Sequence, residues 1–178
     1  MDVIKSIRNN RIAQTAIFKS VLLFFWNRGH QLFQLLIKDD KTYLSLVYRS
    51  RFKKKLNWDN PTTFNEKLQW LKLYNHKPIY ALMADKYAVK RFVADTIGEE
   101  YVVPCLGVWD RAEDIDFDAL PDQFVLKCNH NSGYGRCICR NKSEINYEEV
   151  RKGLKKSLKQ NYYLPGRDKQ YRDIPRKV

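Results

Sequence analysis

The chain has few of the features that mark a disulfide-bonded or membrane-spanning protein. It holds only four cysteines in 178 residues, too few for a fold held together by disulfides. Its longest unbroken apolar run is Val21–Trp26, far short of the ~20 residues that cross a bilayer. Met1–Gln14 has no apolar core followed by a small-residue cleavage site, so no secretory signal is visible. These absences favour a cytoplasmic, reducing location.

Several catalytic motifs are also missing. The sequence has no Gly-Lys-Ser or Gly-Lys-Thr of a P-loop, no serine-hydrolase elbow and no metalloprotease helix. Acidic residues are fewer than basic ones, and the formal net charge is +13. The excess positive charge lies at the two ends of the chain, around a mildly acidic centre. Basic ends suit anionic partners such as phosphorylated substrates, membrane headgroups or nucleic acid.

The residues that are present predict an α/β (α+β) protein with a real core, since 44% of them are hydrophobic. We expect a helical N-terminal region over residues 1–60, a nucleotide-binding part with a small mixed sheet and flanking helices over 61–160, and a basic tail over 161–178. Apolar residues recur at helical spacing through Val3–Lys38. This segment is either a helix packed on the protein or an amphipathic helix lying on the inner face of a membrane.

Capping residues and breaks place the other helices. A second helix is expected at Thr42–Lys54, and its basic C-terminal end complements the helix dipole. Thr63-Phe64-Asn65-Glu66 has the spacing of a capping box after the break at Asn60-Pro61. Further helices are expected at Ile79–Ala84, from Asp85 to Gly98, and at Tyr147–Gln160 with Asn146 as its N-cap.

Short strands are predicted from β-prone residues between turn signals. They are Tyr101–Pro104, Leu106–Trp109, Gln123–Cys128 and Arg136–Arg140. The third has little polar alternation, which is typical of a strand buried on both faces.

A lysine follows this buried-looking strand and leads into a glycine-bearing loop. Lys127 would emerge from the sheet, and Gly133 and Gly135 would allow backbone N–H groups to approach a phosphate closely. Asn129 and Ser132 could add side-chain hydrogen bonds. A β-hairpin whose turn happens to be rich in glycine explains the same pattern.

Three blocks of sequence resemble the TupA-like (teichuronopeptide-synthesis-type) ATP-grasp family. They are Asn60-Pro61-Thr62-Thr63-Phe64-Asn65-Glu66-Lys67-Leu68-Gln69-Trp70, Ala84-Asp85-Lys86-Tyr87-Ala88-Val89 and Leu120-Pro121-Asp122-Gln123-Phe124-Val125-Leu126-Lys127-Cys128-Asn129-His130. The resemblance covers about residues 40–174. It implies that Lys86 and Lys127 bind ATP phosphates and that the loop from His130 to Gly135, including Ser132 and Gly133, closes over them. The family usually has glycine where this chain has Asn131, a residue that tolerates the left-handed conformation.

The resemblance also implies an activity. The intact family would use ATP and Mg²⁺ to convert a carboxylate to an acyl phosphate that an amine attacks, in synthesis of a cell-surface polysaccharide or polymer. The magnesium ligands are expected on a second, C-terminal lobe, because only Asp168 and Asp173 follow Glu149. We therefore expect a truncated ATP-grasp protein that is inactive alone.

Two alternatives use the same residues. Cys128, His130, Cys137 and Cys139 could suggest zinc, but their spacing differs from that of common structural sites, and core packing explains them better. The basic ends and eleven tyrosines could instead form a nucleic-acid or anionic-surface binding module. No nucleic-acid binding motif is legible, and we expect no nucleic acid among the partners.

Overall fold

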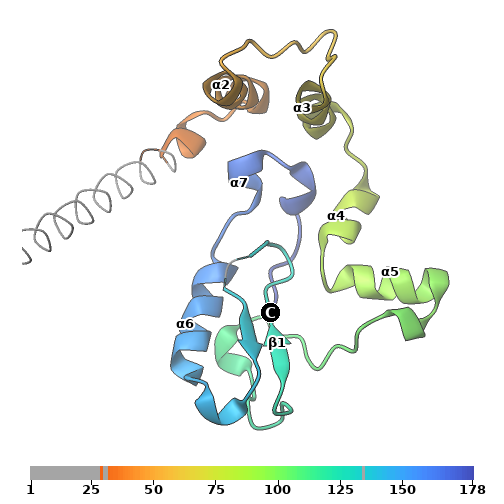
Figure 1. The fold of residues 1–178 in the computed structure, drawn as a ribbon, viewed down its shortest axis with the longest axis vertical. Coiled ribbons are helices and arrows are strands. Elements are labelled where there is room, and N and C mark those ends of the chain that lie inside the picture. The colour runs from red at the N-terminus through yellow and green to blue at the C-terminus, as the bar shows by residue number, and fades with distance from the viewer. Residues whose placement is uncertain (1–28, 30–31, 134) are drawn as a thin grey trace, which may run out of the picture. The chain divides into compact units, whose positions relative to one another are not determined.

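The computed structural model describes residues 29, 32–133 and 135–178, which divide into two compact units, Met1–Lys55 and Leu56–Val178 (Figure 1). In the first unit, most of the predicted helix at Val3–Lys38 lies outside the described residues, and its described part is helical at 32–36. Helix α2 spans Asp40–Phe52, which confirms the second predicted helix. It begins earlier than predicted because the Asp39 carboxylate accepts a hydrogen bond from the Thr42 amide at 2.8 Å.

The second unit carries the sheet and the remaining helices, and the α/β class is confirmed. Its elements are, in chain order, α3 (Phe64–Tyr74), α4 (Pro78–Ala84), α5 (Ala88–Ile97), β1 (Phe124–Leu126), β2 (Cys137–Cys139), α6 (Tyr147–Leu158) and α7 (Tyr163–Gly166). Single 3₁₀ turns lie at Glu99–Tyr101, Ala112–Asp114, Lys142–Glu144 and Lys169–Tyr171.

The two strands form an antiparallel hairpin, in which Val125 is paired with Ile138. Phe124 and Leu126 point into the core and pack with Leu154 of α6, which lies beside the hairpin in Figure 1. Val125 and Ile138 point the other way, and each is more than half exposed. The prediction of a strand buried on both faces is therefore wrong. One face covers the core, and the other remains open, as in half-buried antiparallel sheets.

The strands predicted at Tyr101–Pro104 and Leu106–Trp109 are also wrong. The first begins within a 3₁₀ turn, and 102–109 carry no assigned strand. Short β-prone stretches become strands only where a neighbour supplies hydrogen bonds. In this stretch Trp109 exchanges two backbone hydrogen bonds with Val178, at 3.1 and 2.9 Å, but a single residue pair does not make a strand.

The segment that ends in Val178 lies between Trp109 and the end of β1. Val178 pairs with Trp109, while the preceding Lys177 accepts a backbone hydrogen bond from Asn129 at 3.0 Å. Figure 1 shows this end of the chain beside the end of β1. Residues 177–178 thus connect two segments that lie far from them in the sequence.

The predicted capping box of α3 is confirmed. The Thr63 hydroxyl accepts from the Glu66 amide at 3.3 Å, and the Glu66 carboxylate accepts from the Thr63 amide at 3.0 Å. The same carboxylate oxygen also accepts from the Thr62 amide at 3.1 Å. These hydrogen bonds, chiefly from Thr63, lower the pKa of Glu66 from its ordinary 4.5 to about 2.

This carboxylate should make the protein sensitive to acid. Its pKa is lower in the folded chain, so its contribution to stability is complete above the ordinary pKa and is lost as pH falls from about 4.5 to about 2. In Glu66→Gln the amide oxygen can still accept hydrogen bonds but does not titrate. We expect the advantage of the wild type over Glu66→Gln in thermal midpoint to shrink across this range. A difference that stays constant from pH 6 to pH 3, measured at intervals of about half a unit, would contradict the assignment.

Candidate functional site

Asp85 positions the first residue of the site. Its carboxylate oxygen Oδ1 accepts hydrogen bonds from the amides of Tyr87 and Ala88, at 2.9 and 3.2 Å. It thus satisfies amides that open α5, as a capping side chain does. The sequence prediction placed the helix start at Asp85, whereas the structure starts α5 at Ala88, and Asp85 holds the turn before it through the Tyr87 and Ala88 amides. Lys86 lies in the tight turn between the two.

The Lys86 ammonium is surrounded by backbone carbonyl oxygens from the loop after β1. It donates to the oxygens of Cys128 at 3.3 Å and Asn129 at 3.1 Å, and to that of Asn131. The Lys86 amide donates to the same Asn129 oxygen, at 3.2 Å. Backbone and side chain of one residue therefore join the start of α5 to the end of β1.

Lys127 brings a second positive charge to this place. Burial lowers the pKa of Lys86, and the nearby charge of Lys127 lowers it further. Lys127 itself is exposed, and within the described part of the chain it has neither a hydrogen-bond acceptor nor a carboxylate partner. Two ammonium groups that repel each other form a site that an anion would stabilise.

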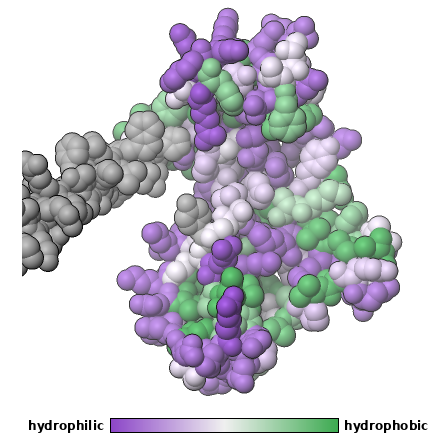
Figure 2. Space-filling model, in the orientation of Figure 1, coloured by the Kyte–Doolittle hydropathy of each residue, from purple (hydrophilic) through white to green (hydrophobic). Residues whose placement is uncertain are grey.

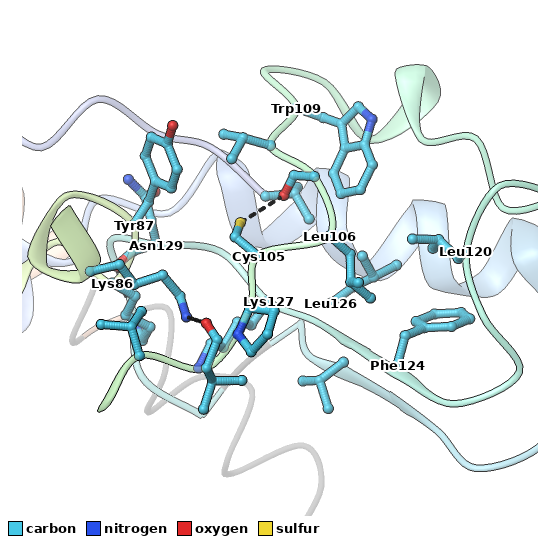
Figure 3. Close-up of a pocket in the computed structure, with 18 of the residues that line it drawn as sticks. Lys86, Tyr87, Cys105, Leu106, Trp109, Leu120, Phe124, Leu126, Lys127 and Asn129 are labelled. Atoms are coloured by element: carbon cyan, nitrogen blue, oxygen red, sulfur yellow. Dashed lines mark hydrogen bonds between the residues drawn. The ribbon is translucent and has the colours of Figure 1, made fainter. Parts of the chain in front are cut away.

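The two lysines line one pocket of about 800 Å³. Its walls come from the start of α5, residues 101–109, β1 with its flanking residues, and Val178. Figure 3 shows Lys86 and Asn129 at one end and the side chains of Leu120 and Phe124 at the other, with Lys127 between them. The described residues that line this pocket include three lysines and no aspartate or glutamate. The pocket therefore has a cationic end and an apolar end.

Apolar residues also border the pocket on the protein surface. Figure 2 shows hydrophobic side chains gathered over α5. Val103, in the pocket wall formed by residues 101–109, is 76% exposed. Val125 of β1 lines the pocket from the open face of the hairpin. Such a surface suits the planar, weakly polar part of a ligand whose charged part lies at the lysines.

Sequence reasoning missed Lys90, the third lysine of the pocket. It lies within α5, four residues after Lys86, and its ammonium donates to the carbonyl oxygen of Val103. It thereby ties α5 to the wall formed by 101–109. The available signal was the spacing of four residues between the two lysines, because a helix was predicted from Asp85 and residues i and i+4 share one face of a helix.

Of the seven predicted cofactor-binding residues, three meet at the pocket and four do not. Lys86, Lys127 and Asn129 line it, whereas His130, Ser132, Gly133 and Gly135 belong to the loop beyond it. Ser132 and Gly133 are exposed. Whether any of these residues contacts a nucleotide stays a prediction.

His130 is buried, with 1% of its surface exposed. Its ring nitrogen Nε2 lies 3.2 Å from the carbonyl oxygen of Gln160 and must carry the hydrogen, since a carbonyl only accepts. Nδ1 has no hydrogen-bond partner in the described part of the chain. Burial, the largest cause, lowers the pKa of His130, which favours the neutral ring.

The glycine loop differs from the expectation at Asn131. The described non-glycine residues with positive φ are Lys53 and Arg167, so Asn131 does not adopt the left-handed conformation. Its buried side chain instead donates a hydrogen bond to the Ser157 hydroxyl of α6. The left-handed positions of the loop are Gly133, with φ 82°, and Gly135, with φ 61°. At position 131 the chain thus has a side-chain hydrogen bond to α6, and not a backbone conformation that needs glycine.

Cys128 and Cys139 belong to the core cluster. Burial raises the pKa of the Cys128 thiol, which favours the protonated form. Within the described residues there is no group of three or more histidine, cysteine or acidic side chains that could hold a metal ion. Cys128, His130, Cys137 and Cys139 therefore form no such group in the described part of the chain.

The basic end of α2 is exposed, and it includes Arg49, Arg51 and the three consecutive lysines 53–55. Contact of this segment with a membrane surface or another polyanion stays a prediction. None of the helices in the described ranges has the length and apolar character needed to cross a membrane.

Comparison with known proteins assigns the part of the chain that contains this pocket. Residues 66–178, more than half of the chain, match the family model described as TupA-like ATPgrasp. The match includes Lys86, Lys127 and the glycine loop. No curated protein and no solved structure matches the chain.

Proposed function

The chain belongs to the TupA-like ATP-grasp family, and from this we propose that its pocket binds the phosphates of ATP between Lys86 and Lys127. The observation that carries the proposal is the meeting of two lysines from distant parts of the chain in one pocket whose described lining has no acidic side chain. An ammonium is a strong partner for phosphate oxygens, particularly where burial limits competition from water.

The rest of the pocket fits the remainder of a nucleotide. Its volume of about 800 Å³ lies in the range usual for small-molecule sites. The exposed apolar side chains of the lining, Val103, Leu106 and Val125, can cover a planar base while the phosphates reach the lysines. In this orientation the exposed Lys127 would contact the phosphates directly. Lys86 would contact them after exchanging some of its carbonyl partners.

The finer activity follows from the family and is part of the proposal. We infer an ATP-dependent carboxylate–amine ligase acting in the cytoplasm on precursors of a cell-surface polysaccharide or polymer. Bound ATP would supply the phosphoryl group that activates the carboxylate. The part of this chemistry that the described residues support is binding and orientation of the phosphates, since they contain no cluster of magnesium ligands.

Calorimetric titration of the protein with MgATP tests the proposal. We expect binding that Lys127→Met weakens at least about tenfold, the effect of losing one charged hydrogen bond. Lys67→Met is the matched control, because Lys67 is an exposed lysine on α3 that does not line the pocket. The proposal fails if the folded wild type does not bind MgATP, or if the two variants weaken binding equally.

A further inference from the structure

The side chain of Asn129 is fully engaged within the protein. Only 4% of the residue is exposed. Its amide nitrogen donates to the Asp85 carboxylate at 3.0 Å and to the Pro175 carbonyl oxygen at 2.8 Å. Its amide oxygen accepts from the Lys177 amide at 2.9 Å. Both hydrogens of the amide are therefore used, and the oxygen also has a partner.

The backbone of Asn129 continues the same connections. Its carbonyl oxygen accepts from the amide and the ammonium of Lys86, and its amide donates to the Lys177 carbonyl oxygen at 3.0 Å. One residue thus joins three segments: the turn at 85–86 that precedes α5, the end of β1, and residues 175–177.

We propose that Asn129 is a positioning residue that holds Lys86 in the pocket and does not itself contact the nucleotide. This role rests on the proposed function and revises the sequence expectation that Asn129 adds a hydrogen bond to a phosphate. Asn129 lines the pocket, but its hydrogens already point to Asp85 and Pro175. A phosphate oxygen accepts hydrogen bonds and would find no free donor on this side chain.

The identity of the side chain matters because both of its neighbours on the nitrogen side are acceptors. Aspartate has nearly the same shape as asparagine but has no hydrogens when ionised. Asn129→Asp would therefore place a carboxylate against the Asp85 carboxylate and the Pro175 carbonyl oxygen, with repulsion in place of two hydrogen bonds. Asn129→Ala is milder, since it leaves space that a water molecule can fill.

Hydrogen exchange measured by NMR tests the network without any ligand. In the wild type we expect the side-chain amide of Asn129 to exchange at least about tenfold more slowly than that of the exposed Asn161, since buried hydrogen-bonded groups exchange only on opening. In Asn129→Ala and Asn129→Asp the backbone amides of Lys86 and Lys177 should exchange faster. Those of α6 should remain protected.

The control variant is Asn161→Asp, because the Asn161 oxygen accepts from the Tyr163 amide and a carboxylate can do the same. It should leave exchange at Lys86 and Lys177 unchanged. Wild-type exchange at Asn129 as fast as at Asn161 would overturn the proposal, even if neither Asn129 variant folds. So would unchanged exchange at Lys86 and Lys177 in a folded Asn129→Ala protein.

Nucleotide affinity then separates positioning from direct contact. Asn129→Ala should weaken MgATP binding about tenfold in the wild type and no more than about twofold in a Lys86→Arg background, because arginine cannot occupy the three-carbonyl site in the same way. Equal losses in both backgrounds mean that Asn129 contacts the nucleotide itself and overturn the proposal. A wild type that does not bind MgATP refutes the proposed function, while the exchange measurements still decide the role of Asn129.

Discussion

Alanine in place of Gly135 is expected to cost about 2–4 kcal/mol of unfolding free energy, the sum of left-handed strain and overpacking. Gly135 has φ 61°, and a Cβ there would lie 2.3 Å from the Cβ of Ser157 and 2.9 Å from the Gly153 carbonyl oxygen. Both atoms belong to α6, and the second is backbone, so the helix cannot yield by rotating a side chain. The loop would have to move away from α6.

Gly133 provides the matched control for Gly135. It also has a positive φ, 82°, but a Cβ there would meet nothing within 4 Å. Gly133→Ala should therefore cost only the conformational strain of about 1 kcal/mol. Urea unfolding of the two variants measures the difference. Equal losses of unfolding free energy in the two variants would mean that contact with α6 does not exclude a side chain at position 135.

Replacing Lys86 with methionine should reduce MgATP affinity about 100-fold and also destabilise the protein by about 1–3 kcal/mol. The ammonium serves three carbonyl oxygens of the loop after β1, and methionine cannot donate to them. The loss of stability should be present without ligand, because these bonds exist within the protein itself.

Lys127→Met is the counterpart that separates the two effects. Lys127 is exposed and has no partner among the described residues. Its replacement should lower affinity while changing the unfolding free energy by no more than about 0.5 kcal/mol. Urea unfolding and calorimetry on the same preparations give both quantities. The distinction is wrong if Lys86→Met unfolds at the same urea concentration as the wild type, or if Lys127→Met is equally destabilised.

Features that depend on neighbouring residues could be predicted from the sequence. The capping box of Thr63 and Glu66 and the cap of α6 by Asn146 each join residues three apart, so their spacing is visible in the chain. The hairpin strands were found but were shorter than predicted. In the predicted strands at 101–109, the β-prone residues were visible, but the neighbours that pair with them were not.

The site was predictable only in part for the same reason. The two lysines were identified by family resemblance, and the structure brings them to one pocket. The carbonyl oxygens around Lys86 and the network of Asn129 join residues more than 40 positions apart. Nothing in the local pattern around Asn129 distinguishes an amide that binds phosphate from one that connects three segments. For Asn131 we predicted only that it could adopt the left-handed conformation. In the structure its buried side chain makes a hydrogen bond to Ser157.

The hydrogen bonds of residues 175–178 set an order of events during synthesis. The ribosome makes Lys86 and Lys127 long before it makes the residues that complete the surroundings of Asn129 and Trp109. At about 5–20 residues per second, several seconds separate the emergence of α5 from that of Val178. From its own emergence until the end of this interval, the side-chain amide of Asn129 lacks its partners Pro175 and Lys177. The pocket can therefore reach its final form only after residues 175–178 have left the ribosome.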